Sequence, residues 1–131
     1  MDAGAKHRFV RRLCAGIAVA FGAVTLFAGG RVLLGADPGY AVFRPLLFFN
    51  TAMGAAYAAA GAAIWRSLAW GRNCAGAIFL LNLLALAGLV AVHFGGGAVA
   101  VQSLGAMSFR TVVWLLLFLV VARLARKGPA K

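Results

Sequence analysis

Few side chains in this sequence could do chemistry, and most of them lie within long apolar runs. Asn50 and Tyr57 share one run, and Asn82 stands in the next. His93 follows near the end of that run, and Arg110 interrupts the last one. A guanidinium binds carboxylates and phosphates, and amide, phenol and imidazole groups exchange hydrogen bonds with polar ligands. Since the set holds no nucleophile paired with a base, we expect no enzyme activity.

Arg110 is the position of greatest interest because its charge interrupts an apolar run. Residues 111–122, which separate it from Arg123, make about 18 Å of helix, whereas the hydrocarbon core is about 30 Å thick. A crossing helix must therefore begin near Ser103, which buries Arg110 by up to about 12 Å. An arginine inside a membrane marks a functional site by default. The alternative is an arginine that snorkels to the surface, or one that is held by Asp37 for purely structural reasons.

A periodic pattern in the second apolar run combines polar and small residues. Asn50, Gly54, Tyr57 and Gly61 recur at spacings of four, three and four, which places them on one helix face. Small residues and amides are typical of helix–helix seams in membranes, so we predict a packing seam, with a ligand-binding face as the alternative. In either case Asn50 and Tyr57 should face the bundle interior.

The remaining polar positions point to packing rather than to a metal site. Asn82, near mid-membrane, is predicted to hydrogen-bond to a neighbouring helix. His93 lies eleven residues later on the same face, before three glycines at 95–97, and is predicted to be an interfacial hydrogen-bonding residue. Cys14 and Cys74 have no CxxC or Cys/His ligand spacing, so we expect no metal site. Each opens a span at its expected cytoplasmic end, where thiols stay reduced, so we expect no disulfide.

The distribution of charge defines the elements that hold these side chains. The chain has 131 residues, 64% of them hydrophobic, and residues 13–30, 45–65 and 73–92 carry no charged side chain or histidine. A helix needs about 20 mainly apolar residues to cross a bilayer, and continuous Ala/Leu/Gly-rich runs indicate helices rather than barrel strands. We predict one all-α integral membrane domain over 1–131, a bundle of four transmembrane helices with spans at about 13–34, 45–65, 74–94 and 103–123.

The thirteen basic residues predict the orientation of this bundle. Ten of them fall in the N-terminus, the 66–73 connection and the C-terminus, and the other three, Arg31, Arg44 and Arg110, lie on the opposite side. Short loops obey the positive-inside rule, so we expect a multi-pass protein of the bacterial inner membrane with both termini cytoplasmic. The net charge of +11 should attract anionic lipids on that side; a nucleic-acid partner is not expected from so apolar a chain.

The outer connection at residues 93–104 is irregular. A triple glycine at 95–97 is followed by the apolar segment 98–102. This pattern indicates a re-entrant or surface-lying segment that caps the bundle, or a contact with another protein.

Two short motifs carry a family resemblance. The first is Asn50, Gly54 and Tyr57 in the second span, and the second is Ala106, Met107, Ser108 and Arg110 at the start of the last. With these motifs the chain resembles small uncharacterised bacterial inner-membrane proteins of four helices, and more distantly the DoxX-like membrane proteins. Such proteins often carry a carboxylate in the last outer loop, whereas residues 93–109 here have none. The resemblance implies architecture and no particular activity.

Three functional hypotheses follow from this sequence. The first is a non-catalytic accessory subunit of a larger membrane complex, because the helices are rich in Gly and Ala and the connections are short. The second is a small-molecule or anion carrier or channel built on Arg110 and the polar interior. The third is a quinone- or lipid-binding protein that uses Tyr57 and Trp114 against an apolar cleft. No other cofactor is expected.

Overall fold

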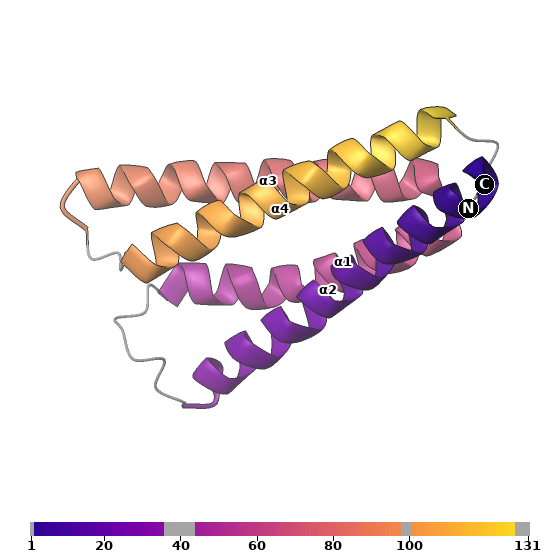
Figure 1. The fold of residues 1–131 in the computed structure, drawn as a ribbon. Coiled ribbons are helices and arrows are strands. Elements are labelled where there is room, and N and C mark those ends of the chain that lie inside the picture. Colours follow the sequence, from indigo (N-terminus) through magenta and orange to yellow (C-terminus); the bar gives the residue numbers. More distant parts are fainter. Residues whose placement is uncertain (1, 36–43, 98–100, 128–131) are drawn as a thin grey trace.

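The computed structural model describes residues 2–35, 44–97 and 101–127, and its regular structure is helical throughout. The helices are α1 (Ala3–Leu33), α2 (Arg44–Arg66), α3 (Leu68–Phe94) and α4 (Val101–Lys127). Each is long and apolar enough to cross a membrane. They pack side by side as a bundle, which confirms the predicted all-α, four-helix membrane fold (Figure 1). Asp37 lies outside the described residues, as do residues 98–100.

Local capping explains where the helices begin and end. Asp2 Oδ1 accepts a hydrogen bond from Ala5 N at 2.6 Å, which satisfies a free N–H group of the first turn of α1. Ser67 alone separates α2 from α3, with extended backbone and an Oγ that accepts from Trp70 N at 3.4 Å. Beyond α3, Gly96 adopts a φ of +86°, a conformation that glycine takes without strain.

Two connections differ from the sequence prediction. The expected loop at 66–73 is reduced to Ser67, so Arg72 lies within α3. On the other side, α4 begins at Val101, so Val101 and Gln102 belong to a helix and not to a separate capping segment. The apolar spacing could not reveal either difference because a helix continues beyond the hydrocarbon wherever its backbone can be capped.

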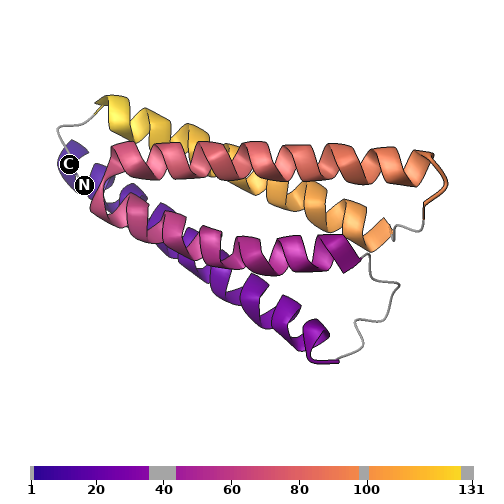
Figure 2. The ribbon, with the colours of Figure 1, turned by 180° about the vertical axis from the view of Figure 1, so that it is seen from behind.

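The helices are arranged as two antiparallel pairs. α1 packs along α2 and α3 packs along α4, while α2 and α3 join the pairs. α1 and α4 contact each other much less; both lie in front of α2 and α3 in Figure 1 and behind them in Figure 2. The N- and C-terminal ends lie at the same end of the molecule. There His7 Nε2 is 3.1 Å from Leu124 O, which links the start of α1 to the end of α4.

Small residues set the distance between α1 and α2. A methyl group placed on Gly22 would lie 2.6 Å from both Gly54 O and Ala58 N, and one on Gly61 would lie 2.8 Å from Ala15 O. These distances are shorter than van der Waals contacts, so the two backbones approach as closely as they do only because these positions are glycine. This is the close packing that small residues allow in membranes.

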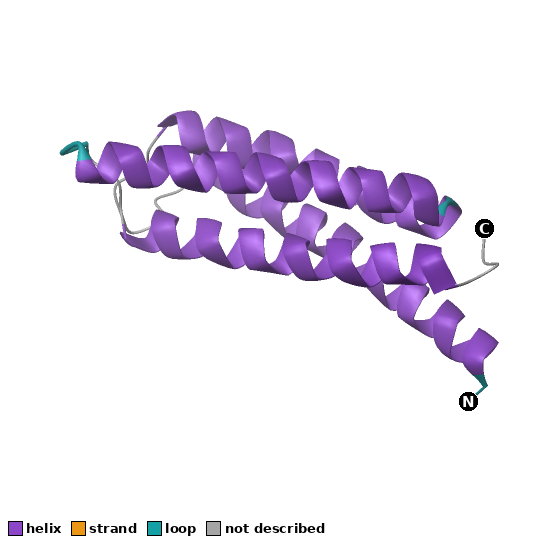
Figure 3. Ribbon diagram, turned by 90° about the horizontal axis from the view of Figure 1, so that it is seen from above, coloured by secondary structure: helices purple, strands orange, loops and turns teal. Residues whose placement is uncertain are grey.

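The core is narrow, and large apolar side chains face outward. Of the apolar window of each span, only 22% to 39% is buried against other helices. The largest fully enclosed side chains are Trp114, Tyr57, Ile64, Met107, Val121 and Asn82. Because leucines, valines and phenylalanines cover the outside, the exposed faces suit lipid rather than water. Figure 3, seen from above, shows the helices running along the whole length of the bundle.

Candidate functional site

A hydrogen bond between two enclosed side chains marks the centre of the bundle. Tyr57 of α2 donates through its hydroxyl to Asn82 Oδ1 of α3, at 3.1 Å, and neither residue has any exposed surface. Both are mid-helix residues, and such polar pairs link helices where no water is available. The structure therefore joins two residues that were singled out from different spans.

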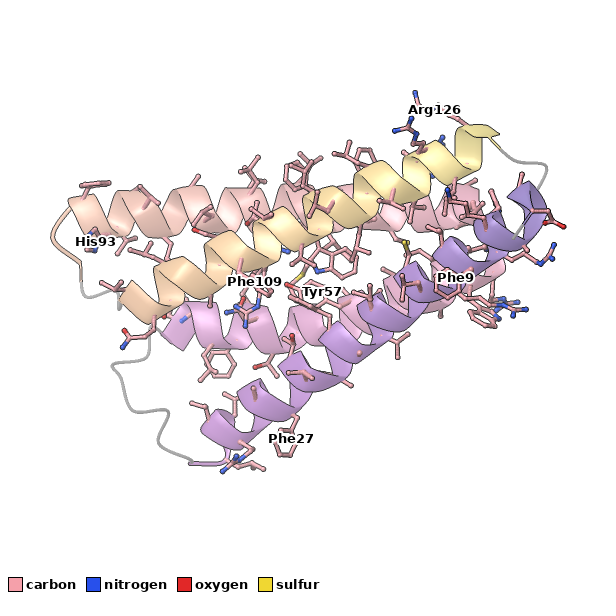
Figure 4. The ribbon with its side chains drawn as sticks, viewed as in Figure 1. Phe9, Phe27, Tyr57, His93, Phe109 and Arg126 are labelled. Atoms are coloured by element: carbon pink, nitrogen blue, oxygen red, sulfur yellow. The ribbon has the colours of Figure 1, made fainter. Side chains whose placement is uncertain are left out.

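Aromatic rings from the first and last helices, α1 and α4, surround this hydrogen bond. Trp114 of α4 stacks on Tyr57, with ring centroids 5.0 Å apart and an interplanar angle of 23°. Phe21 of α1 meets Tyr57 edge-on at 5.2 Å and Trp114 edge-on at 6.2 Å. Phe21, Tyr57, Asn82 and Trp114, which we call the central cluster, thus come from α1, α2, α3 and α4 in turn. Figure 4 shows Tyr57 between the helices.

Several hydrogen-bonding atoms in this region have no partner among the described residues. They are Asn82 Nδ2 and Trp114 Nε1 in the central cluster, and Asn50 Oδ1 two helical turns from Tyr57. A buried polar atom without a hydrogen bond costs about 1–3 kcal/mol, so such atoms usually mark a water, an ion or a ligand. In the central cluster both of them are N–H donors, which suit an acceptor or an anion.

Arg110 lies on the α4 face that carries the central cluster. It follows Met107 by three residues and precedes Trp114 by four, and both of these are fully enclosed. Arg110 itself is half-buried. The neighbouring Phe109 is exposed and stacks on Phe21 with centroids 6.2 Å apart. A cation therefore stands at the edge of the donor-rich centre.

Asp37, which holds Arg110 in the structural alternative, lies outside what the structure describes. Asp37 is one of the undescribed residues, and Asp2 caps α1 at the end of the molecule that carries the termini. Within the described residues, Arg110 forms no ion pair with a carboxylate. The pairing with Asp37 thus stays a prediction.

The other predicted site residues lie apart from the central cluster. Gly54 and Gly61 line the seam between α1 and α2. His93 is exposed at the end of α3, where its ring meets Phe94 edge-on at 5.6 Å, so the helical spacing from Asn82 does not bring it into the interior. Across residues 2–35, 44–97 and 101–127, no three His, Cys, Asp or Glu side chains lie together as metal ligands.

Sequence reasoning missed Phe21 altogether. It is one of ten phenylalanines in the chain, and no spacing distinguished it from those that face lipid. A second omission concerns Arg11, whose Nε donates to Ile64 O and whose Nη2 donates to Trp65 O, both at 2.9 Å. In the sequence this residue contributed only a charge, whereas in the structure it caps the end of α2.

Comparison with known proteins adds no relative. No family model matches this chain, and no curated protein or solved structure is significantly similar to it. The chain is a polytopic membrane protein by the length and hydropathy of its four helices.

Proposed function

We propose that this protein is a small membrane carrier or channel that binds an oxyanion between Arg110 and the central cluster. The observation that carries the proposal is the pair of buried N–H donors without acceptors, Asn82 Nδ2 and Trp114 Nε1, on the same side of the bundle interior as a half-buried cation. An anion that leaves water must be compensated by charge and by N–H groups, and these residues supply both.

The side chains present favour a planar, two-oxygen ligand. A guanidinium binds carboxylates in a bidentate geometry, which leaves the amide and indole donors for the remaining lone pairs. The role of these residues is binding, with no bond made or broken.

The test uses anion uptake into proteoliposomes. A panel of acetate, benzoate, nitrate and phosphate would be offered to the wild type, to Arg110→Gln and to a matched control, Arg31→Gln. Arg31 is an exposed arginine at the end of α1 whose guanidinium lies 5.6 Å from the Phe27 ring centre. Loss of a hydrogen bond to a charged group, which contributes about 1.5–3 kcal/mol, should lower uptake by more than tenfold in Arg110→Gln and leave the control unchanged. Equal uptake by all three, or no uptake of any anion by the wild type, contradicts the proposal.

A second candidate is an accessory subunit of a larger membrane complex. It is supported by glycines on outward faces, since a methyl group placed on Gly16, Gly88 or Gly105 would have no neighbour within 4 Å. Small residues at such positions allow another transmembrane helix to approach closely. Under gentle solubilisation, a partner protein should copurify at fixed stoichiometry, and Gly16→Leu with Gly88→Leu should release it. Recovery of the wild type as a lone monomer would sink this candidate.

A quinone cleft at Tyr57 and Trp114 is the least supported hypothesis. The two rings stack on each other and are fully enclosed, so they present no open face to a quinone ring. For this reason we do not propose it further.

A further inference from the structure

Three arginines of α1 line a cleft at the end of the bundle that carries both termini. Arg8, Arg11 and Arg12 are spaced by three and by one residue, so that they point to one side of the helix. Together with Trp65 of α2 they line a cleft of about 170 Å³. Neither Arg110 nor any residue of the central cluster lines this cleft.

Arg11 fixes one wall of the cleft. Its two hydrogen bonds reach Ile64 O and Trp65 O, both in the last turn of α2. The final carbonyl groups of a helix have no partner within the helix, so these bonds cap α2 and at the same time hold α1 against it. The position of the cleft therefore follows from helix packing and does not depend on a loop.

The other two arginines offer their donors outward. Arg8 and Arg12 are exposed, and the Arg12 guanidinium lies 5.6 Å from the centre of the Trp65 ring, where a cation–π contact orients it. Asp2, the one carboxylate among the described residues, accepts from Ala5 N as the cap of α1. The cleft thus gathers three positive charges that form no ion pair with a described carboxylate, and a bound anion would relieve their mutual repulsion.

We propose that this cleft binds the phosphate group of an anionic phospholipid. Guanidinium groups match phosphate oxygens in a fork geometry that an ammonium cannot reproduce. Trp65 is 56% exposed at the end of a spanning helix, the position at which tryptophan lies among lipid headgroups. The positive-inside orientation places the cleft in the cytoplasmic leaflet, whose anionic lipids are drawn to arginines beside a span.

The test measures lipid retention by the full chain. The purified protein is mixed in detergent with equal amounts of phosphatidylglycerol and phosphatidylcholine of the same acyl chains, and retained lipid is read by native mass spectrometry. Wild type should retain phosphatidylglycerol preferentially. The Arg8→Gln/Arg12→Gln variant should lose at least about tenfold of that retention. The control, Arg123→Gln/Arg126→Gln, removes the same charge from exposed positions at the same end (Figure 4) and should behave as wild type.

Three results would overturn the proposal. They are no preference in the wild type, equal losses in the two double variants, and displacement of the lipid by millimolar inorganic phosphate, which would assign the cleft to a soluble phosphate. Arg11 stays unchanged because it caps α2. If the glutamine variant loses helix content, Arg8→Lys/Arg12→Lys decides: it keeps both charges without the fork, and about threefold weaker retention is expected. Unchanged retention in that variant would count against a phosphate clamp.

Discussion

At the scale of single residues, the hydrogen bond between Tyr57 and Asn82 links α2 to α3. Tyr57→Phe removes the donor and leaves Asn82 Oδ1 enclosed without a partner. Hydrogen bonds between transmembrane helices contribute about 0.6 kcal/mol on average and up to about 1.7. We expect Tyr57→Phe to destabilise the bundle by about 1–2 kcal/mol, measured by unfolding in mixed micelles.

A double-mutant cycle checks this interpretation. Asn82→Leu removes both the acceptor and the unpartnered Nδ2, so the double variant should cost less than the sum of the two single changes. Additive costs would show that the two side chains are not coupled. Full additivity would also remove the reason to treat the central cluster as a unit.

At this scale the sequence could predict the inward helix face and the hydrogen bond of Asn82 to a neighbouring helix. The spacing of Asn50 and Tyr57 predicted an inward face, and Tyr57 is indeed fully enclosed while Asn50 is half-buried. The partner of Tyr57 was not predictable, because periodicity within one helix carries no information on the rotation and register of the next. Phe21 stayed hidden for the same reason.

At the scale of helices, the α1–α2 seam depends on glycine. We predict that Gly22→Ala destabilises the bundle by about 1–3 kcal/mol, because the added methyl group meets the α2 backbone, which cannot move aside as a side chain would. Gly16→Ala is the matched control, since it lies on the same helix with nothing within 4 Å of the added group. Thermal unfolding in detergent should separate the two variants, and equal midpoints would refute the role of the seam.

The spans themselves were the most predictable part of the fold. Charge-free runs of sufficient length define them because a charged group in hydrocarbon is costly, and this constraint acts on each helix separately. α1 and α3 begin ten and six residues before the predicted spans, since capping by Asp2 and Ser67 lies outside the apolar pattern. Which helices pack together depends, by contrast, on the shapes of their surfaces. The sequence therefore did not reveal that α1 and α4 contact each other little.

At the scale of the whole molecule, the arrangement fixes which ends share a side of the membrane. The termini and Ser67 lie at one end, with Leu34 and Phe94 at the other. With Cys14 and Cys74 replaced by alanine, we predict that Leu34→Cys and Phe94→Cys react with a membrane-impermeant maleimide in spheroplasts, while Ser67→Cys does so only after lysis. The physical reason is the excess of basic residues at the Ser67 end, which retains it in the cytoplasm. Labelling in the reverse pattern would contradict the orientation.

The single-residue connection at Ser67 has a consequence for the order of assembly during synthesis. Because a single residue joins α2 to α3, we expect the two helices to enter the membrane together as a helical hairpin. Tyr57 and Asn82 lie across that hairpin, so their bond can form before α4 has been translated. Each of these polar side chains alone would be costly to place in lipid. Their hydrogen bond within the hairpin would shield both of them from lipid during insertion.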